Sequence, residues 1–112
     1  MDPFFTATDP RGIKIICTEE AWQHILDHRE DWDPEDEWEF DVIRAIENAS
    51  AIYTDSERTE NVEVYYCKPG VRAYYMKVIV EFIDGTGYVV TAFEASKGKK
   101  GELLVWMNSS HS

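Results

Sequence analysis

Seven residues of this sequence have side chains that could together cleave a phosphodiester without a metal ion: His24, His28, Lys77, Thr91, Glu63, Tyr65 and Tyr75. Such cleavage of RNA needs a base for the 2′-hydroxyl, an acid for the leaving 5′-oxygen, and a cation or donor for the phosphorane. Histidine is the natural acid and base near neutral pH, lysine is a point charge for phosphate, and hydroxyls are fixed donors. We therefore predict catalytic roles for the histidines, Lys77 and Thr91, and substrate-binding roles for Glu63 and the two tyrosines.

Each of these residues also has an ordinary structural explanation. A histidine at the border of a helix's apolar stripe is usually a packing residue. A lysine on a strand can extend along apolar surface or pair with Glu63 or Glu94. Threonine and tyrosine are common in strands and in sheet packing.

Lys77 lies in the element around which we expect the fold to form, a long β-hairpin from Val71 to Phe93. β-Branched and aromatic residues fill both arms, and Asp84–Gly87 supplies the turn. Alternation places Lys77 on the face away from the core. We expect Glu63 and Tyr65 on that same face.

The length of the hairpin loop decides where Thr91 points. A two-residue loop would turn Thr91 into the core, whereas a three-residue loop, Asp84–Thr86, pairs it with Ile79 on the face of Lys77. We favour the longer loop, with Gly87 in the left-handed bulge position. It also places over the core the side chains of Tyr88, Val90 and Ala92.

The two histidines lie one turn apart on the first of two predicted helices. Thr18 is a good N-cap, acidic residues occupy the first turn, and an apolar stripe continues to about Arg29. At about 100° per residue, His28 falls at the edge of this stripe and His24 points further toward solvent.

We expect one α+β domain, residues 1–112, with two N-terminal helices packed on an antiparallel sheet of four to five strands. The second helix begins at Asp33-Pro34 and ends at Asn48 or Ser50. Residues 1–12 are expected to form an arm over the surface and residues 108–112 a frayed tail. The remaining predicted strands are 13–17, 51–53, 62–67 and 102–107.

Charge is distributed unevenly along the chain, whose formal net charge is −11. Residues 1–61 hold 17 acids and 5 bases, and residues 62–112 hold 5 acids and 6 bases. A uniformly acidic surface would repel RNA, but a nearly neutral sheet half permits a nucleic-acid surface there.

The composition also bears on redox state, metals and compartment. Cys17 and Cys67 are expected to be buried free thiols. Neither the cysteines nor the histidines have the spacing of a zinc finger, so we expect no metal and no cofactor. No run reaches the length of a membrane span or a signal peptide, which favours a cytoplasmic protein.

Several short motifs, in order, resemble those of phage and bacterial nuclease-like domains grouped with barnase, EndoU, the RNA-cleaving colicins and RelE. They are Trp22-Gln23-His24-Ile25, His28-Arg29-Glu30, Asp41–Ile46, Ala51–Asp55, Tyr65-Tyr66, Lys77–Val80 and Gly87–Phe93. This family commonly has proline after the second histidine, where this chain has Arg29.

The resemblance implies a metal-independent endoribonuclease, of toxin or phage origin, with RNA as substrate and a site on the sheet. The alternative is a non-catalytic interaction module, such as an inhibitor or immunity-type protein, whose acidic first half imitates a polyanion. We expect a monomer, or a homodimer formed through the last strand.

Overall fold

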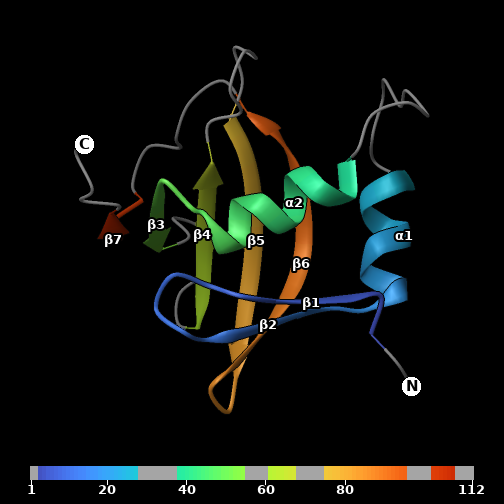
Figure 1. Cartoon of the computed structure of the whole chain (residues 1–112), viewed down its shortest axis with the longest axis horizontal. Coiled ribbons are helices and arrows are strands. Elements are labelled where there is room, and N and C mark those ends of the chain that lie inside the picture. The colour runs from blue at the N-terminus through green and yellow to red at the C-terminus, as the bar shows by residue number, and fades with distance from the viewer. Residues whose placement is uncertain (1–2, 28–37, 55–60, 68–74, 96–101, 108–112) are drawn as a thin grey trace.

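The computed structural model describes residues 3–27, 38–54, 61–67, 75–95 and 102–107 (Figure 1). Within these residues the fold is α+β, with two helices and one seven-stranded sheet in the order β1-β2-β6-β5-β4-β3-β7. All neighbouring strands are antiparallel except β2 and β6, which are parallel. The elements are β1 (Phe5–Thr8), β2 (Lys14–Cys17), α1 (Glu19–Asp27), α2 (Trp38–Glu47), β3 (Ala51–Thr54), β4 (Val62–Cys67), β5 (Tyr75–Ile83), β6 (Thr86–Ala95) and β7 (Leu104–Met107).

The predicted class is confirmed, but three of its details were wrong. Among the described residues the sheet has seven strands instead of four or five, and it is mixed. The strand predicted before the first helix, 13–17, is confirmed as β2. The predicted arm contains β1, in which Phe5 and Ala7 are buried and alternate with exposed threonines. The predicted tail lies outside the described residues.

The two helices cover different parts of the sheet (Figure 1). Helix α1 lies beside β6, and α2 lies over β4 and β5. The expected N-cap of α1 is confirmed, because Thr18 Oγ1 accepts a hydrogen bond of 3.1 Å from the Ala21 N–H. The main hydrophobic core includes the buried helix residues Trp22, Ile25, Val42, Ala45 and Ile46.

The hairpin of β5 and β6 closes with the two-residue loop Asp84-Gly85, not with the expected three-residue loop. Both loop residues have positive φ, 51° and 83°, as a type I′ turn requires. Thr91 nevertheless pairs with Ile79, as predicted. A β-bulge beside Ile79 adds one residue to β6 and restores the alternation that the short loop alone would have reversed.

This bulge also decides which side chains of β6 face the core. Ala92 is buried there, as predicted, but its partner in the core is Val89. Tyr88 and Val90, which were predicted over the core, are only half-buried. Tyr88 pairs with Glu81 and lies on the opposite face.

Gly87 serves close packing and not a left-handed backbone, which corrects the prediction for it. Among the described glycines, only Gly12 and Gly85 have positive φ. A Cβ at Gly87 would lie 2.5 Å from Cδ1 of Ile15 and 2.8 Å from Cγ1 of Val80. Strand β2 pairs with β6 at this position, and the missing side chain leaves room for the side chains of Ile15 on β2 and Val80 on β5.

The sheet has an inner face, which packs against the helices, and an outer face on the other side. Tyr65 pairs with Val78, and both belong to the main core, so they mark the inner face. Tyr66 pairs with Lys77, and strand alternation places this pair on the outer face. Glu63 shares the inner face with Tyr65, so the prediction that both join Lys77 on one face was wrong.

Candidate functional site

The outer face carries a buried ion pair. Lys77 Nζ lies 3.4 Å from Oε2 of Glu102, and the two side chains are only 8% and 4% exposed. The Tyr66 hydroxyl donates to the same carboxylate, at 2.8 Å from Oε1 and 3.0 Å from Oε2. We call Lys77, Glu102 and Tyr66 the Lys77 cluster. Replacing a buried ion pair by apolar residues of similar volume often leaves a fold equally stable, so stability alone does not explain why this pair is present. The Lys77 cluster is therefore a candidate for chemistry.

Aromatic rings enclose the ammonium group of this cluster. Lys77 Nζ is 5.5 Å from the ring centroids of both Tyr66 and Phe93, within the range of a cation–π contact. Tyr75 meets Tyr66 edge-to-face at 6.1 Å. Tyr66 is 4% exposed and Phe93 is 40% exposed. The cluster is therefore closed on the β4 side and reaches the surface at Phe93.

Strand register and one loop contact position the cluster. Lys77 on β5 lies between Tyr66 on β4 and Phe93 on β6, each directly opposite it in the ladder. Glu102 precedes β7, and the next residue, Leu103, is fixed to Thr54. The Thr54 N–H donates to the Leu103 carbonyl at 2.8 Å, and the Leu103 N–H donates to Thr54 Oγ1 at 3.1 Å.

Thr91 and Tyr75 share the outer face with Lys77. Thr91 pairs with Ile79, the next outward residue along β5, and is half-buried. Tyr75 is also half-buried and is the outward residue that precedes Lys77 on β5. Both were predicted site residues, and the structure brings them to the face of the cluster.

Of the two predicted histidines, the structure describes His24, which lies on α1. The ladder of β2 with β6 ends at Tyr88, and α1 lies beside β6 on the side away from β5 (Figure 1). Beyond Tyr88 no described strand pairs with β6 on that side, so the helix lies at an edge of the sheet. His24 is exposed on α1, and His28 lies outside the described residues.

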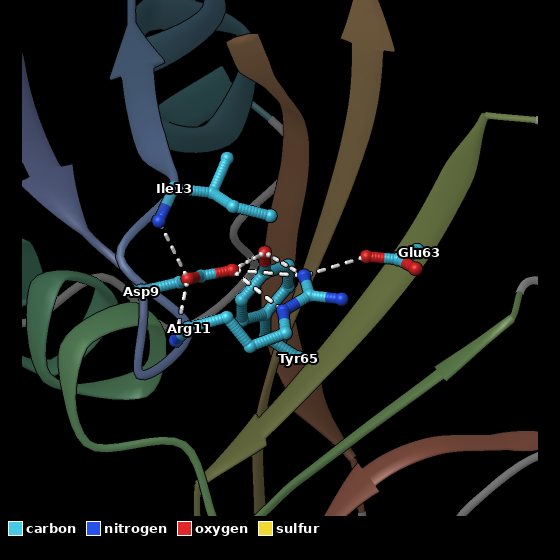
Figure 2. A network of polar contacts seen from close by, with 5 residues as sticks. All are labelled: Asp9, Arg11, Ile13, Glu63 and Tyr65. Atoms are coloured by element: carbon cyan, nitrogen blue, oxygen red, sulfur yellow. Dashed lines mark hydrogen bonds and ion pairs between the residues drawn. The ribbon is translucent and has the colours of Figure 1, made fainter. Parts of the chain in front are cut away.

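Glu63 and Tyr65 belong to a second polar group, under the turn between β1 and β2 (Figure 2). Figure 2 shows the Arg11 guanidinium reaching between these strand residues and Asp9. Arg11 Nη2 lies 2.8 Å from Asp9 Oδ2, 2.7 Å from Glu63 Oε1 and 3.0 Å from the Tyr65 hydroxyl. The Tyr65 hydroxyl donates to Asp9 Oδ2 at 2.7 Å. We call these four residues the Asp9 network.

The Asp9 network fixes the turn between β1 and β2 to β4. Asp9 Oδ1 accepts the N–H groups of Arg11, at 2.8 Å, and Ile13, at 3.0 Å. Tyr65 is fully buried, and the Asp9 side chain has no exposed area. Glu63 and Tyr65 therefore stabilise the turn between β1 and β2, and their substrate-binding role stays a prediction.

The pKa values in this network follow from burial and pairing. Burial alone would raise the pKa of Asp9, but the Tyr65 hydroxyl, the Ile13 N–H and Arg11 stabilise the carboxylate, and the net effect lowers its pKa. Burial raises the pKa of Tyr65, and its bond to Asp9 raises it further. Burial would lower the pKa of Arg11, but Glu63 and Asp9 raise it overall.

Three further expectations concern the cysteines, metal sites and membrane spans of the described residues. Cys17 and Cys67 are buried thiols that form no disulfide, as predicted, and burial raises the pKa of Cys17 to about 12. The described part of the chain contains no group of three His, Cys, Asp or Glu residues placed to hold a metal ion. Neither described helix has the length and apolar character to span a membrane.

Comparisons of the chain with protein-family models, with curated proteins and with solved structures find no match. The resemblance to metal-independent ribonucleases therefore stays a prediction from short motifs. The structure bears on the proposed chemistry through placement alone: three of the seven predicted site residues, Lys77, Thr91 and Tyr75, share the outer face.

The sequence reasoning missed Glu102 and Tyr66, the two partners of Lys77. Glu102 is 25 residues from Lys77 and precedes a short strand, so no periodic pattern connects the two. Assigning the outer face of β4 to Tyr66 instead of Tyr65, a shift of one residue, would have placed Tyr66 beside Lys77. Both faces of β4 contain buried residues, however, so the sequence pattern does not select one of them.

Proposed function

We propose that this protein is a metal-independent ribonuclease whose site is the Lys77 cluster on the outer face of the sheet. The proposal rests on one observation: an ammonium group, a carboxylate and a phenol meet at the border of the accessible part of this face. These groups can supply a cation for the phosphorane, a base for the 2′-hydroxyl and a fixed hydrogen-bond donor. Glu102 thereby takes the role of base, which was predicted for a histidine.

The ion pair suggests how substrate binding could activate the base. In the resting protein, Lys77 and Glu102 neutralise each other across 3.4 Å. A phosphodiester anion that takes the place of the carboxylate beside Lys77 releases Glu102, which can then accept the 2′ proton. The 2′-oxygen attacks phosphorus, a 2′,3′-cyclic phosphate forms, and the bond to the 5′-oxygen breaks.

The leaving 5′-oxygen needs a proton, and the outer face needs a further donor to the phosphate. We assign the proton to His24, which is exposed on α1 at the edge of β6, and keep His28, outside the described residues, as the predicted alternative. The Thr91 hydroxyl, on the same face as Lys77, is the added donor. These assignments combine the predicted residues with Glu102, which the fold brings to Lys77.

The test is cleavage of a labelled single-stranded RNA in EDTA by the wild type and by Glu102→Gln. The amide keeps the size of the side chain and an acceptor for Tyr66 but cannot take the 2′ proton. We expect kcat to fall about 10²- to 10⁴-fold, the usual contribution of a general base. The wild type should leave a 2′,3′-cyclic phosphate end and should not cut where the 2′-hydroxyl is replaced by hydrogen.

Glu81→Gln is the matched control, because Glu81 is an exposed glutamate on the same outer face. It should cleave at the wild-type rate. Equal kcat values for Glu102→Gln and the wild type, with both folded by circular dichroism, would remove Glu102 as the base. A folded wild type that cuts no RNA would refute the proposed function itself.

The acidity of the first half favours a second candidate, the non-catalytic interaction module. Residues 1–61 have a formal charge of −12, and Glu19, Glu20 and Asp27 are exposed on α1. An inhibitor of this kind would bind a basic protein through charge complementarity. It would be supported if the chain cleaves no RNA but inhibits a purified basic ribonuclease, with inhibition that weakens as salt is added.

A further inference from the structure

Phe93 stands out among the large apolar side chains that remain exposed. It is the one aromatic residue among the exposed large hydrophobics on the described strands, and it is 40% exposed. Its ring contacts the Lys77 ammonium, at 5.5 Å from centroid to Nζ. One part of the ring thus covers the cation, and the rest is open to solvent.

The surroundings of Phe93 suit a nucleobase and its phosphate. Tyr75, Ile79 and Thr91 lie on the same face and are half-buried. Together they offer two further apolar surfaces, from Tyr75 and Ile79, and two hydroxyls, from Tyr75 and Thr91. A base stacked on Phe93 would hold its own phosphate close to Lys77, the cation that the proposed mechanism uses.

The outer face has few charged side chains, which permits an anionic ligand to approach it. Along β3, β4, β5 and β6, the outward side chains at the described positions include two charged residues, Lys77 and Glu81, and Glu102 adds one carboxylate to this face from the segment before β7. Most of the acidic residues of the chain therefore lie elsewhere. With so few cations available, affinity on this face has to come from stacking more than from phosphate contacts.

We infer that Phe93 is a stacking platform for an unpaired nucleobase, and that it limits the substrate to single-stranded RNA. This inference rests on the proposed ribonuclease function and names its substrate class. A base inside a duplex is already stacked on both sides, so only an unpaired base can lie on an aromatic side chain. The nearby backbone then presents one phosphate to Lys77.

The experiment measures binding without cleavage. A fluorescently labelled single-stranded DNA, which has no 2′-hydroxyl, is titrated with the full chain and followed by anisotropy. Phe93→Leu should weaken binding roughly 5- to 150-fold, which corresponds to the loss of one stacked base, and Phe93→Trp should retain it. The logarithm of the binding constant should fall with the logarithm of salt concentration with a slope of about −0.7, as expected for one phosphate contact.

Phe40→Leu is the matched control, because Phe40 is 60% exposed but lies on α2. It should bind as the wild type does, and a duplex of the same sequence should bind more weakly than the single strand. Equal affinity of Phe93→Leu and the wild type, or of duplex and single strand, overturns the inference.

The outcomes separate the two proposals. Binding through Phe93 without RNA cleavage refutes the ribonuclease and retains the stacking platform. Cleavage of RNA that is unaffected by Phe93→Leu retains the ribonuclease and refutes the platform. If the folded wild type neither binds nor cleaves, both are refuted.

Discussion

Replacing Tyr65 by phenylalanine removes one oxygen atom from the centre of the Asp9 network. This hydroxyl donates to Asp9 Oδ2 at 2.7 Å and accepts from Arg11 Nη2 at 3.0 Å. Since Tyr65 and the Asp9 side chain are fully buried, water has no access with which to replace it.

The expected cost follows from the partners that remain. A hydrogen bond to a charged group contributes about 1.5–3 kcal/mol. The two bonds share one oxygen, and Asp9 keeps its bonds to Arg11 and to two backbone N–H groups. We therefore expect Tyr65→Phe to lower the free energy of unfolding by about 1.5–3 kcal/mol in total, and not by twice that amount.

The assay is urea unfolding of the wild type and Tyr65→Phe at about pH 7. Tyr88→Phe is the matched control, since Tyr88 is half-buried on the outer face and its hydroxyl has no hydrogen-bond partner among the described residues. We expect it to change stability by less than about 0.5 kcal/mol. RNA cleavage by Tyr65→Phe should remain at the wild-type level under conditions where it is folded.

The difference between Tyr65→Phe and the wild type should depend on pH in a defined direction. The folded-state pKa of Asp9 lies below its ordinary value of 3.8. The contribution of the carboxylate is therefore complete above the unfolded pKa and is lost as pH falls through the folded pKa. Unfolding measured from about pH 6 down to about pH 2.5 should show the two proteins converging in stability.

Two results would refute this reasoning. One is a stability difference near zero at neutral pH, which would mean that the network does not form as described. The other is lost RNA cleavage with unchanged stability, which would return Tyr65 to the substrate-binding role predicted from the sequence.

Two further substitutions test the packing of the sheet. Lys77→Met should lower the free energy of unfolding by about 3–5 kcal/mol, because it leaves Glu102 buried without its cation. The double variant Lys77→Met with Glu102→Leu should recover most of that stability in urea unfolding. It should not recover RNA cleavage. A double variant as unstable as the single one would show that the pair is not the cause. Gly87→Ala should lower the free energy of unfolding by about 1–3 kcal/mol, because the new methyl group would overlap the side chains of Ile15 and Val80. Unchanged stability would contradict this close packing around Gly87.

The sequence by itself determined the local elements of this protein. Thr18 followed by acidic residues and an apolar stripe identified α1, and the alternation in 62–67 identified β4 with the observed bounds. Asp84-Gly85 between two β-rich arms identified the central hairpin. These features depend on residues close together in the chain, so propensity and periodicity were sufficient to find them.

The tertiary structure alone decided how these elements combine into a site. β4 contains buried residues on both of its faces, so only the strands beside it could decide that Tyr66, and not Tyr65, lies next to Lys77. The bulge in β6 reset the register of Thr91, and its position depends on packing across the whole sheet.

Glu102 shows the same limit most clearly. Strand β7 pairs with β3 at the end of the sheet, and Glu102, two residues before β7, contacts Tyr66 and Lys77. Contacts between residues distant in sequence are fixed by which surfaces can be buried together, and local pattern carries no record of that choice. The sequence could therefore identify the lysine of the candidate site, whereas its carboxylate partner required the fold.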